Sequence, residues 1–293
     1  MTCIQKIYSL SVLVGNGECN GRCEFCAGAY LRSQAKENTN NKNFEKNLES
    51  AIKLCSRYGG WSLSLTSAGE PTCDPEAVTR ALQVYDKCAK QGAYMPNVNL
   101  FTNGILLGDK SFAADWLPEW KSLGLTNVAV SVHSVEREKQ AFAYGIDCNK
   151  YPCFHRLFNT IREHGLGVRC TLLLRKGEVD NAESYARAIE KLYFYGCDNV
   201  TSWPIGNPDG SRNAFTPSQW GLFTIKKWLW FNTTTCHEHA WSGGVYDHKG
   251  NMLRLTDYVT KHDPKKDYVR QLVVFPDGCV TYSWVTHGAL CMK

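Results

Sequence analysis

The sequence is informative first through what it lacks. No apolar run approaches the roughly 18 residues of a transmembrane helix, and residues 1–14 lack the basic start and small-residue cleavage site of a signal peptide. It has no internal repeat and no low-complexity linker. The net charge is only +5, from 33 Lys and Arg against 28 Asp and Glu, which is too small to indicate binding to nucleic acids or membranes. We therefore expect a soluble cytoplasmic monomer with neither a membrane nor a DNA partner.

Cysteine, by contrast, is abundant, with 14 residues in the chain. Hydrophobic residues make up 43% of the sequence, so a chain of this length can build a core without disulfide staples. Cys55 and Cys170 lie inside apolar runs, where a reduced thiol packs as a small hydrophobic group. We expect free thiols in a reducing compartment, and the informative cysteines are those with regular spacing.

Strand-like and helix-like patterns alternate over the first 206 residues. The predicted strands are 7–14, 61–66, 98–102, 128–132, 168–174 and 200–204, and the predicted helices are 44–58, 75–90, 111–123, 153–163 and 182–195. This alternation predicts an α/β protein with a parallel sheet and right-handed crossovers. Spacing alone leaves open a doubly wound sheet or a partial barrel, and both fold types bind ligands at the carboxyl ends of the strands.

The pattern changes after residue 206. We expect a Trp-rich helix at 217–230 and hairpin turns at 247–251 and 275–278. The predicted organisation is a core of residues 1–206 and a C-terminal α+β extension of residues 207–293 that covers the barrel mouth and shapes the substrate pocket. Aromatic residues near and within the extension either stack on a substrate or pack in the core, and these are Trp203, Trp220, Trp228, Trp230, Trp241, Tyr246, Tyr258, Tyr282 and Trp284.

Three cysteines follow the first predicted strand in the segment CNGRCEFC. Cys19, Cys23 and Cys26 have the spacing C-x3-C-x2-C. A structural zinc site needs four ligands, and no nearby Cys or His completes one. With three cysteines, a [4Fe–4S] cluster keeps one iron open for another ligand. Zinc with a distant fourth ligand and three incidental cysteines are the alternatives, but the position at a strand's carboxyl end favours chemistry.

With this loop, the sequence resembles the radical S-adenosylmethionine (radical SAM) superfamily. The resemblance implies a partial (β/α)6 TIM-type barrel over about residues 7–206. It also implies that the three cysteines hold a [4Fe–4S] cluster whose open iron binds the amine and carboxylate of SAM. In the family, reduction by a donor such as flavodoxin or ferredoxin cleaves SAM to methionine and a 5′-deoxyadenosyl radical, which abstracts hydrogen from the substrate.

Further elements agree with the resemblance at the ends of later strands. Gly69, Glu70 and Pro71 match the family's G-E-P element, which implies contact with the SAM ammonium group. Thr102-Asn103-Gly104 resembles its T-N-G element. Taken alone, each tripeptide is equally typical of a turn. On the fourth strand, Ser131 matches a polar residue that contacts SAM in the family, and His133 lies beside it.

Arg175 and Phe25 complete the predicted SAM contacts. The fifth strand resembles that of the molybdenum-cofactor cyclase branch, so Arg175 is the candidate ligand of the SAM carboxylate, which its guanidinium fork fits. The alternative is a solvated arginine past a strand end. Phe25 matches the aromatic position that packs on adenine. The glycine-and-isoleucine pattern that some members use for adenine on the fifth strand is not clear here.

Two kinds of substrate fit these features. One is a small molecule or a nucleotide, and the other is a peptide or protein side chain modified by a maturase. Only 18 residues precede Cys19, too few for an N-terminal recognition domain, which favours the first. A non-enzymatic iron–sulfur scaffold or sensor would leave the G-E-P and T-N-G elements unexplained.

No second cluster is expected. Cys236, Cys279 and Cys291 in the extension have no C-x2-C pair. Cys236, His237 and His239 resemble a metal clip but are too close in sequence to surround one ion well. Asp257 and Tyr258 are weaker candidates for the barrel mouth.

Overall fold

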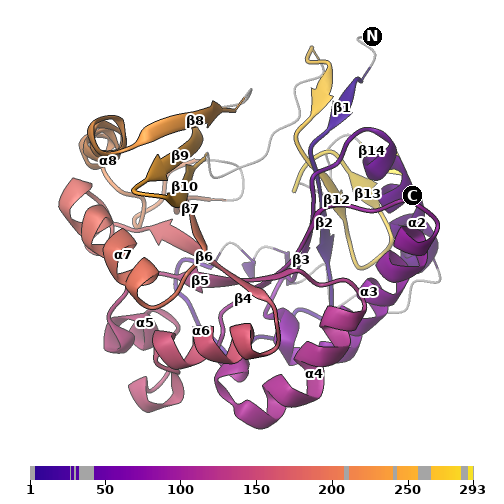
Figure 1. Ribbon diagram of the computed structural model, residues 1–293, viewed down its shortest axis with the longest axis horizontal. Coiled ribbons are helices and arrows are strands. Elements are labelled where there is room, and N and C mark those ends of the chain that lie inside the picture. Colours follow the sequence, from indigo (N-terminus) through magenta and orange to yellow (C-terminus); the bar gives the residue numbers. More distant parts are fainter. Residues whose placement is uncertain are drawn as a thin grey trace.

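The six predicted parallel strands are present and lie side by side in sequence order. They are β2 (Ser9–Leu13), β3 (Ser62–Thr66), β4 (Asn97–Thr102), β5 (Asn127–Val132), β6 (Gly167–Leu174) and β7 (Asn199–Pro204). The structure is a computed structural model and describes residues 4–26, 28–29, 31–32, 43–207, 211–239, 243–256, 265–284 and 290–292. In Figure 1 the sheet curves into an open U and does not close. The predicted partial α/β barrel is therefore confirmed.

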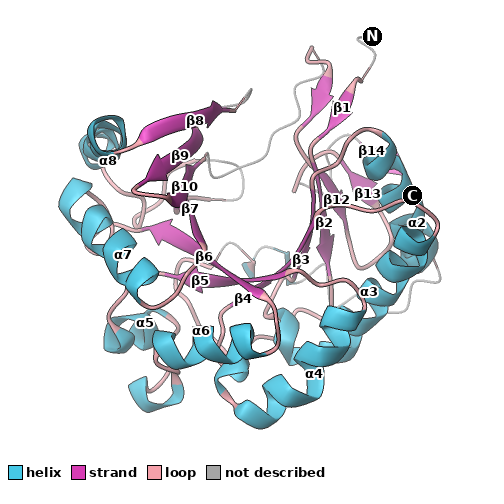
Figure 2. Cartoon of the chain, in the orientation of Figure 1, coloured by secondary structure: helices cyan, strands magenta, loops and turns pink. Residues whose placement is uncertain are grey.

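The helices that connect these strands cover the convex face of the sheet (Figure 2). They are α2 (Phe44–Arg57), α3 (Pro75–Lys90), α4 (Lys110–Ser122), α5 (Arg137–Ala143), α6 (Phe154–Glu163) and α7 (Ala182–Phe194). α3 begins at the predicted residue, Pro75, because the Asp74 carboxylate accepts from the N–H of Ala77 over 3.1 Å and Pro75 needs no N–H partner. The short helix α5 was not predicted, and it proves important for the site.

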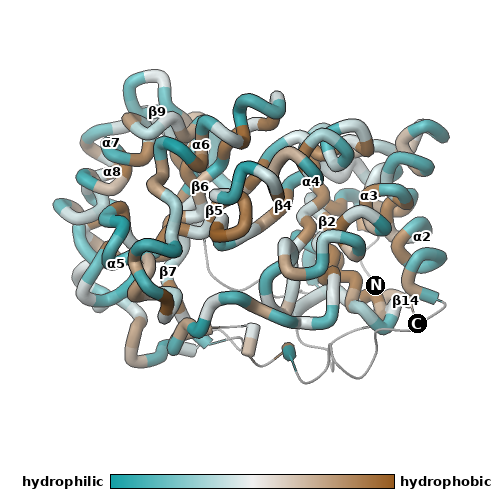
Figure 3. Tube along the Cα trace, turned by 90° about the horizontal axis from the view of Figure 1, so that it is seen from below, coloured by the Kyte–Doolittle hydropathy of each residue, from teal (hydrophilic) through white to brown (hydrophobic). Residues whose placement is uncertain are grey.

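The outward side chains of the strands form the core with these helices. Leu63 and Leu65 of β3 and Val128 and Val130 of β5 are fully buried under the helices. Along the trace in Figure 3, the helices alternate between hydrophobic and hydrophilic residues, as expected for helices with one face on a sheet. None of the helices among the described residues is long and apolar enough to cross a membrane.

The C-terminal residues extend the same sheet at both of its edges. Beyond β7 the sheet continues with β10 (Asn251–Leu255), then β9 (Gly244–His248) and β8 (Thr234–Glu238). Beyond β2 it continues with β12 (Leu272–Val274), then β13 (Val280–Thr281) and β14 (Leu290–Met292). Both predicted hairpin turns are present, and the strands that they join belong to the main sheet. β10 pairs parallel to β7 and β12 parallel to β2, because the edge strands of the six-stranded set need partners for their backbone groups.

Two further features complete the fold. The predicted Trp-rich helix is α8 (Gln219–Asn232), which Ser218 caps by accepting from the N–H of Gly221 over 2.9 Å. A separate two-stranded sheet joins β1 (Lys6–Ile7) to β11 (Tyr268–Val269). The segment that leads into the first core strand is thus tied to the C-terminal part of the chain.

The concave face of the sheet is polar and encloses a cavity of about 680 Å³. Its lining includes Ser11 of β2, Ser64 of β3, Asn99 of β4, Arg169 of β6 and Thr201 of β7. In many closed barrels of this type, branched apolar side chains fill the interior. Here the alternation of polar and apolar residues along each strand leaves room for a ligand.

Candidate active site

The three cysteines of the C-x3-C-x2-C motif lie on one loop after β2, and each is partly buried. Burial, followed by the neighbouring Cys26 and Cys19 thiols, raises the pKa of Cys23 to about 12. The N–H of Gly21 donates to the Cys19 sulfur over 3.3 Å, and Arg32 Nη2 donates to the Cys26 sulfur over 3.1 Å. The loop therefore gathers three thiols and supplies donors to two of them.

The donor set of the loop suits an iron–sulfur cluster. Within the described parts of the chain, no group of three or more His, Cys, Asp or Glu side chains forms a site for a single metal ion. In a [4Fe–4S] cluster each thiolate binds a different iron, and this loop offers three partly buried thiols. The residues fit a cluster that has three cysteine ligands.

The loop after β3 is in backbone contact with the cysteine loop. An ideal Cβ on Gly69 would lie 2.0 Å from the Glu18 carbonyl oxygen, so only glycine fits there. Pro71 is buried and begins the short 3-10 helix η1 (Pro71–Cys73). Cys73 was not among the residues predicted from the sequence. Burial raises the pKa of its thiol most, and Glu70 and the nearby Cys19 raise it further.

The Glu70 carboxylate connects the ends of two neighbouring strands. It accepts from the Thr102 hydroxyl over 2.6 Å, from the Asn103 N–H over 2.7 Å, and from the N–H and hydroxyl of Thr72 over 3.1 and 2.7 Å. Burial raises the pKa of Glu70, and these hydrogen bonds oppose the increase. Three of these donors share Oε1 and one binds Oε2, so Glu70 organises the site and Oε2 can still accept one more hydrogen bond.

The predicted T-N-G element forms a turn that contacts the cysteine loop. Asn103 Nδ2 donates to Asn20 Oδ1 over 2.6 Å, which joins the end of β4 to the loop. Gly104 has a φ of +79°, a left-handed conformation that favours glycine. Glu70 and Asn103 therefore form one hydrogen-bonded group around the cysteines.

Phe25 of the cysteine loop forms a second group with His133 and Arg175. The Phe25 ring lies 4.7 Å from the His133 ring and 5.4 Å from that of Phe215, and the Arg175 guanidinium lies 5.3 Å from its centroid. Burial, with a smaller contribution from Arg175, lowers the pKa of His133 to about 3, so its ring is neutral. Arg175 Nη2 lies 3.7 Å from the Glu178 carboxylate.

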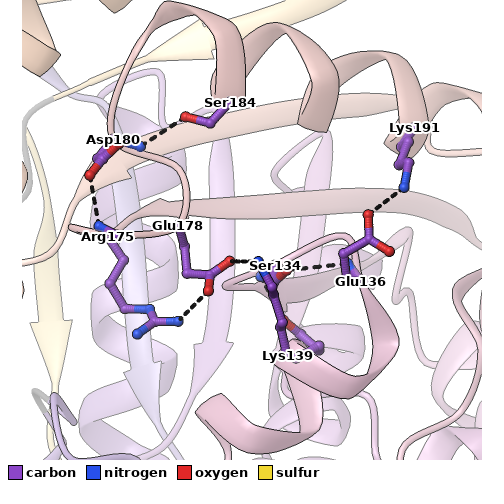
Figure 4. Close-up of polar contacts among 10 residues, drawn as sticks. Ser134, Glu136, Lys139, Arg175, Glu178, Asp180, Ser184 and Lys191 are labelled. Atoms are coloured by element: carbon purple, nitrogen blue, oxygen red, sulfur yellow. Dashed lines mark hydrogen bonds and ion pairs between the residues drawn. The ribbon is translucent and has the colours of Figure 1, made fainter.

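Figure 4 shows Glu178 between two cations. Its carboxylate faces Arg175 on one side and Lys139 on the other, where the separation is 3.6 Å. The Arg175 side chain is only 13% exposed, so it is not the solvated arginine of the alternative interpretation. A long ion pair holds it beside Phe25, where a carboxylate ligand could compete with Glu178.

Helix α5 supports the second group through residues that the sequence reasoning did not identify. Gln140 Oε1 accepts from the N–H of His133 over 2.8 Å, and Tyr144 donates to the Ser131 carbonyl over 2.9 Å. Tyr151 follows α5 and donates to the Asn103 carbonyl over 3.1 Å. The spacing of Gln140 and Tyr144 by four residues, on one helix face, was the available signal.

Four buried side-chain nitrogens around the loop have no hydrogen-bond partner among the described residues. They are Asn20 Nδ2, Arg32 Nε, His133 Nδ1 and Arg175 Nε. Each belongs to the cysteine loop or to the groups that surround it. A buried polar group without a partner costs about 1–3 kcal/mol, so their grouping indicates a polar ligand at this place.

Other candidates lie apart from this site or outside the described residues. Cys236 is exposed on β8, whereas Cys279 and Cys291 lie at the opposite end of the sheet, next to β13 and on β14. His237 and His239 line the cavity. Trp241, Asp257 and Tyr258 lie outside the described residues.

The aromatic residues near and within the extension have three kinds of surroundings. Trp203 and Trp284 line the cavity, and Trp228, Tyr246 and Tyr282 pack against the core. Trp220 and Trp230 of α8 are 71% and 82% exposed, so neither interpretation offered from the sequence describes them.

Comparisons with known proteins agree with this geometry. The radical SAM superfamily profile matches residues 14–192. Among solved structures, SuiB from Streptococcus suis bound to S-adenosylmethionine is similar, with a TM-score of 0.61, 11% identity, and coverage of 98% of this chain and 63% of SuiB.

Two other solved structures share the fold. One is HydG, a maturase of the [FeFe]-hydrogenase, with a TM-score of 0.55, 10% identity, and coverage of 75% of this chain and 49% of HydG. The other is anSMEcpe with bound AdoMet, with a TM-score of 0.51, 17% identity, and coverage of 77% and 60%. This chain spans less than two thirds of each of the three structures. No curated protein sequence matches it significantly. Since the family profile covers more than half of the chain, this protein belongs to the radical SAM superfamily, whose members are enzymes that use a [4Fe–4S] cluster and S-adenosylmethionine.

Proposed function

We propose that this enzyme cleaves SAM reductively at a [4Fe–4S] cluster and abstracts hydrogen from a small-molecule or nucleotide substrate in the barrel cavity. The observation that supports this best is the cysteine loop, with three thiols and four unsatisfied buried nitrogens around it. When bound, the cluster and SAM supply an electron and a 5′-deoxyadenosyl radical that removes a hydrogen atom. The protein supplies orientation and a closed environment.

In this proposal Cys19, Cys23 and Cys26 bind three irons of the cluster. Arg32 donates to the Cys26 sulfur and places a positive charge beside it, which stabilises the cluster's more negative, reduced state. Gly69 lets the loop after β3 approach so closely that its backbone carbonyls can reach the SAM ammonium group. Glu70 fixes that loop, and its carboxylate stays a proposed ligand of the ammonium group.

The second group would hold the rest of SAM. Arg175 would bind the SAM carboxylate with a guanidinium fork, in competition with Glu178. Ser131 and the neutral His133 would offer hydrogen bonds, and Phe25 would pack on adenine by moving off the His133 ring. These four contacts account for two of the unsatisfied nitrogens, those of His133 and Arg175.

The cavity gives the substrate a place beside the cluster. Its lining includes Gly28 and Leu31 of the cysteine loop and Ser67 of the loop after β3. We propose that the extension, residues 207–293, forms the rest of this pocket, since Trp284 and His239 lie on its wall. Excluding water there would protect a primary radical from quenching. An external donor such as flavodoxin or ferredoxin would supply the electron.

The alternative is a maturase that modifies a peptide or protein side chain. One feature favours it: β8 ends the sheet, and all five of its residues are exposed. An extended peptide could add there as a further strand.

Anaerobic reconstitution with iron and sulfide, followed by dithionite and SAM, tests the proposed function. We expect wild-type protein to release 5′-deoxyadenosine, measured by chromatography and mass spectrometry. Replacing all three of Cys19, Cys23 and Cys26 by alanine should abolish both the release of 5′-deoxyadenosine and the iron–sulfur absorbance at about 400 nm. Cys153→Ala, which removes an exposed cysteine at the start of α6, is the matched control and should change neither. Retention of the absorbance in the triple variant would refute the cluster assignment.

A labelled extract separates the two substrate classes. Cells grown in deuterated medium are lysed, and the extract is divided by ultrafiltration into small molecules and macromolecules. Deuterium in the 5′-deoxyadenosine formed with the small-molecule fraction supports the proposed function. Deuterium found with the macromolecular fraction alone supports the maturase.

A further inference from the structure

Two arginines face the barrel cavity from neighbouring parts of the sheet. Arg169 lies on β6 and Arg254 on β10, and both line the cavity. Thr201 of β7 pairs with Thr171 of β6 on one side and with Arg254 on the other. Because Arg169 and Thr171 are two residues apart on one strand, they share a face. The two guanidinium groups therefore belong to one wall.

Neither arginine has an acidic partner among the described residues. Arg169 Nε donates to Asn199 Oδ1 over 3.0 Å, and its Nη1 donates to Asn99 Oδ1 over 2.9 Å. Arg254 Nε donates to His239 Nε2 over 2.9 Å. All three acceptors are neutral. Since a guanidinium carries five N–H donors, most of those on the two arginines find no acceptor in the described residues.

The cavity wall as a whole is positively charged. Its described lining contains the cations Lys6, Arg169, Arg254 and Arg270 and no Asp or Glu. Burial, then repulsion by Arg169 and Arg270, lowers the pKa of Arg254 to about 10, which shows that the cations are close enough to disfavour one another. Removing a charge from water without a counter-ion is costly, and Arg169 and Arg254 have only neutral partners among the described residues, so their place on this wall points to an anionic ligand.

We propose that Arg169 and Arg254 bind an anionic group of the substrate, a carboxylate or a phosphate, inside the barrel. This rests on the proposed function and narrows its substrate class to an anion. An arginine fork matches both groups through paired hydrogen bonds, and an anion between the two guanidinium groups supplies the missing counter-charge.

The position of the arginines also orients the substrate. Arg169 precedes Arg175 by six residues on the strand whose end lies at the proposed SAM site, a separation of about 20 Å along an extended chain. The cavity runs from this wall to Gly28 of the cysteine loop. The anionic group thus sits deep in the barrel, and the carbon that loses hydrogen lies toward the cluster.

Calorimetric titration of the reconstituted protein tests the anion site without a known substrate. The probes are inorganic phosphate and succinate at constant ionic strength, up to about 10 mM, with neutral succinamide as the control ligand. We expect heat from at least one anion and none from succinamide. Heat from phosphate but not from succinate identifies a phosphate site, and heat from succinate but not from phosphate identifies a carboxylate site. Heat from neither anion overturns the inference.

Variants assign the binding to the two arginines. Arg169→Gln and Arg254→Gln should each weaken binding at least about tenfold, because a charged hydrogen-bond donor is lost. Arg80→Gln removes the same charge from an exposed position on α3 and should leave affinity unchanged. Equal affinity in all three variants overturns the assignment.

One further variant does not depend on removing an arginine. Asn199→Asp places a carboxylate at the oxygen that accepts from Arg169, so it should raise the melting temperature and weaken anion binding about tenfold. Unchanged anion affinity in folded Asn199→Asp protein contradicts the inference.

Release of 5′-deoxyadenosine by wild-type protein is measured in parallel. Release without anion binding rejects the anion site alone, whereas anion binding without release rejects the proposed function alone.

Discussion

The backbone N–H of Glu70 donates to the carbonyl oxygen of Glu18 over 2.7 Å, which ties the loop after β3 directly to the cysteine loop. Gly69 makes this contact possible, because a Cβ there would lie 2.0 Å from the same oxygen. We expect Gly69→Ala to destabilise the protein by about 2 kcal/mol or more and to lower the iron bound after reconstitution. Thermal unfolding and iron analysis measure both effects.

Gly59→Ala serves as the control for that change. Gly59 has a φ of +75° but nothing within 4 Å of an added Cβ. The Gly59→Ala variant should have a free energy of unfolding only about 1–2 kcal/mol lower, because of backbone strain, and it should keep its iron. An equal loss of iron in both variants would mean that close approach of the loops is not the cause.

The second prediction concerns Arg175 and its neighbour Glu178. Arg175→Gln should weaken SAM binding about tenfold or more, because a charge-assisted pair with the SAM carboxylate is lost. Glu178→Gln should strengthen it, since the carboxylate 3.7 Å from Arg175 no longer competes. Equilibrium binding to reconstituted protein measures both. Weaker SAM binding in Arg175→Gln together with stronger SAM binding in Glu178→Gln supports the assignment. An unchanged SAM affinity in Arg175→Gln removes Arg175 from the SAM site.

The third prediction concerns the reduction potential of the cluster. Arg32 donates to the Cys26 sulfur over 3.1 Å, and in the proposed cluster its positive charge would favour the reduced state. Arg32→Gln should lower the reduction potential of the cluster by some tens of mV. Arg32→Lys keeps the positive charge, so its potential should stay close to that of the wild type. A redox titration followed by electron paramagnetic resonance gives the values. Equal potentials in Gln and Lys variants would show that the charge has no effect.

The fourth prediction is an acid-dependent loss of stability caused by His133. Its pKa falls from 6.5 to about 3 on folding, chiefly through burial. Below pH 6.5 the unfolded chain therefore binds a proton that the folded protein does not. The contribution of neutral His133 to the free energy of unfolding is fully present above pH 6.5. It declines by up to about 1.4 kcal/mol per pH unit as the pH falls toward 3.

His133→Phe isolates this effect. Phenylalanine can pack on Phe25 and Tyr144 as the histidine ring does, but it does not titrate. Denaturant unfolding of cluster-free protein at several pH values should show a smaller pH slope in the variant, since acid itself destroys iron–sulfur clusters. Identical slopes in the two proteins would place the titrating group elsewhere.

The fifth prediction is one cluster per chain. Reconstituted protein should contain about four irons and four sulfides. Cys279→Ser and Cys291→Ser should not change these values, because both cysteines lie at the far end of the sheet from Cys236. A reproducible content near eight irons, lowered by either substitution, would establish a second cluster in the extension.

The alternation of strands and helices was predictable because it depends on local periodicity. Every core strand lies within a residue or two of its predicted bounds, and α3 matches at both ends. The predicted hairpins formed as well, but their destination did not follow from the sequence. Which edge a strand such as β12 joins depends on unsatisfied backbone groups of β2, more than 250 residues away in the chain.

The site was predictable where a motif is contiguous. The cysteine motif and the short elements around Glu70 and Asn103 could be found by reading along the chain. Arg169 and Arg254 could not be paired in this way, since only the register of β6, β7 and β10 makes them neighbours. The alternation in SLSLT (62–66) was a missed signal of a polar interior.

The parallel pairing of β2 with β12 has a consequence for how the enzyme matures. The Ser9 hydroxyl donates to the Arg270 carbonyl across 261 positions of sequence, so the strand that carries the cysteine loop obtains its outer neighbour only after β12 has been synthesised. Contacts of this span form late in folding. The cysteines leave the ribosome well before β12 does, yet the base of their loop is held on both sides only afterwards. Delivery of iron and sulfide would then follow the synthesis and docking of β12, and the assembly machinery would meet a barrel that is already largely folded.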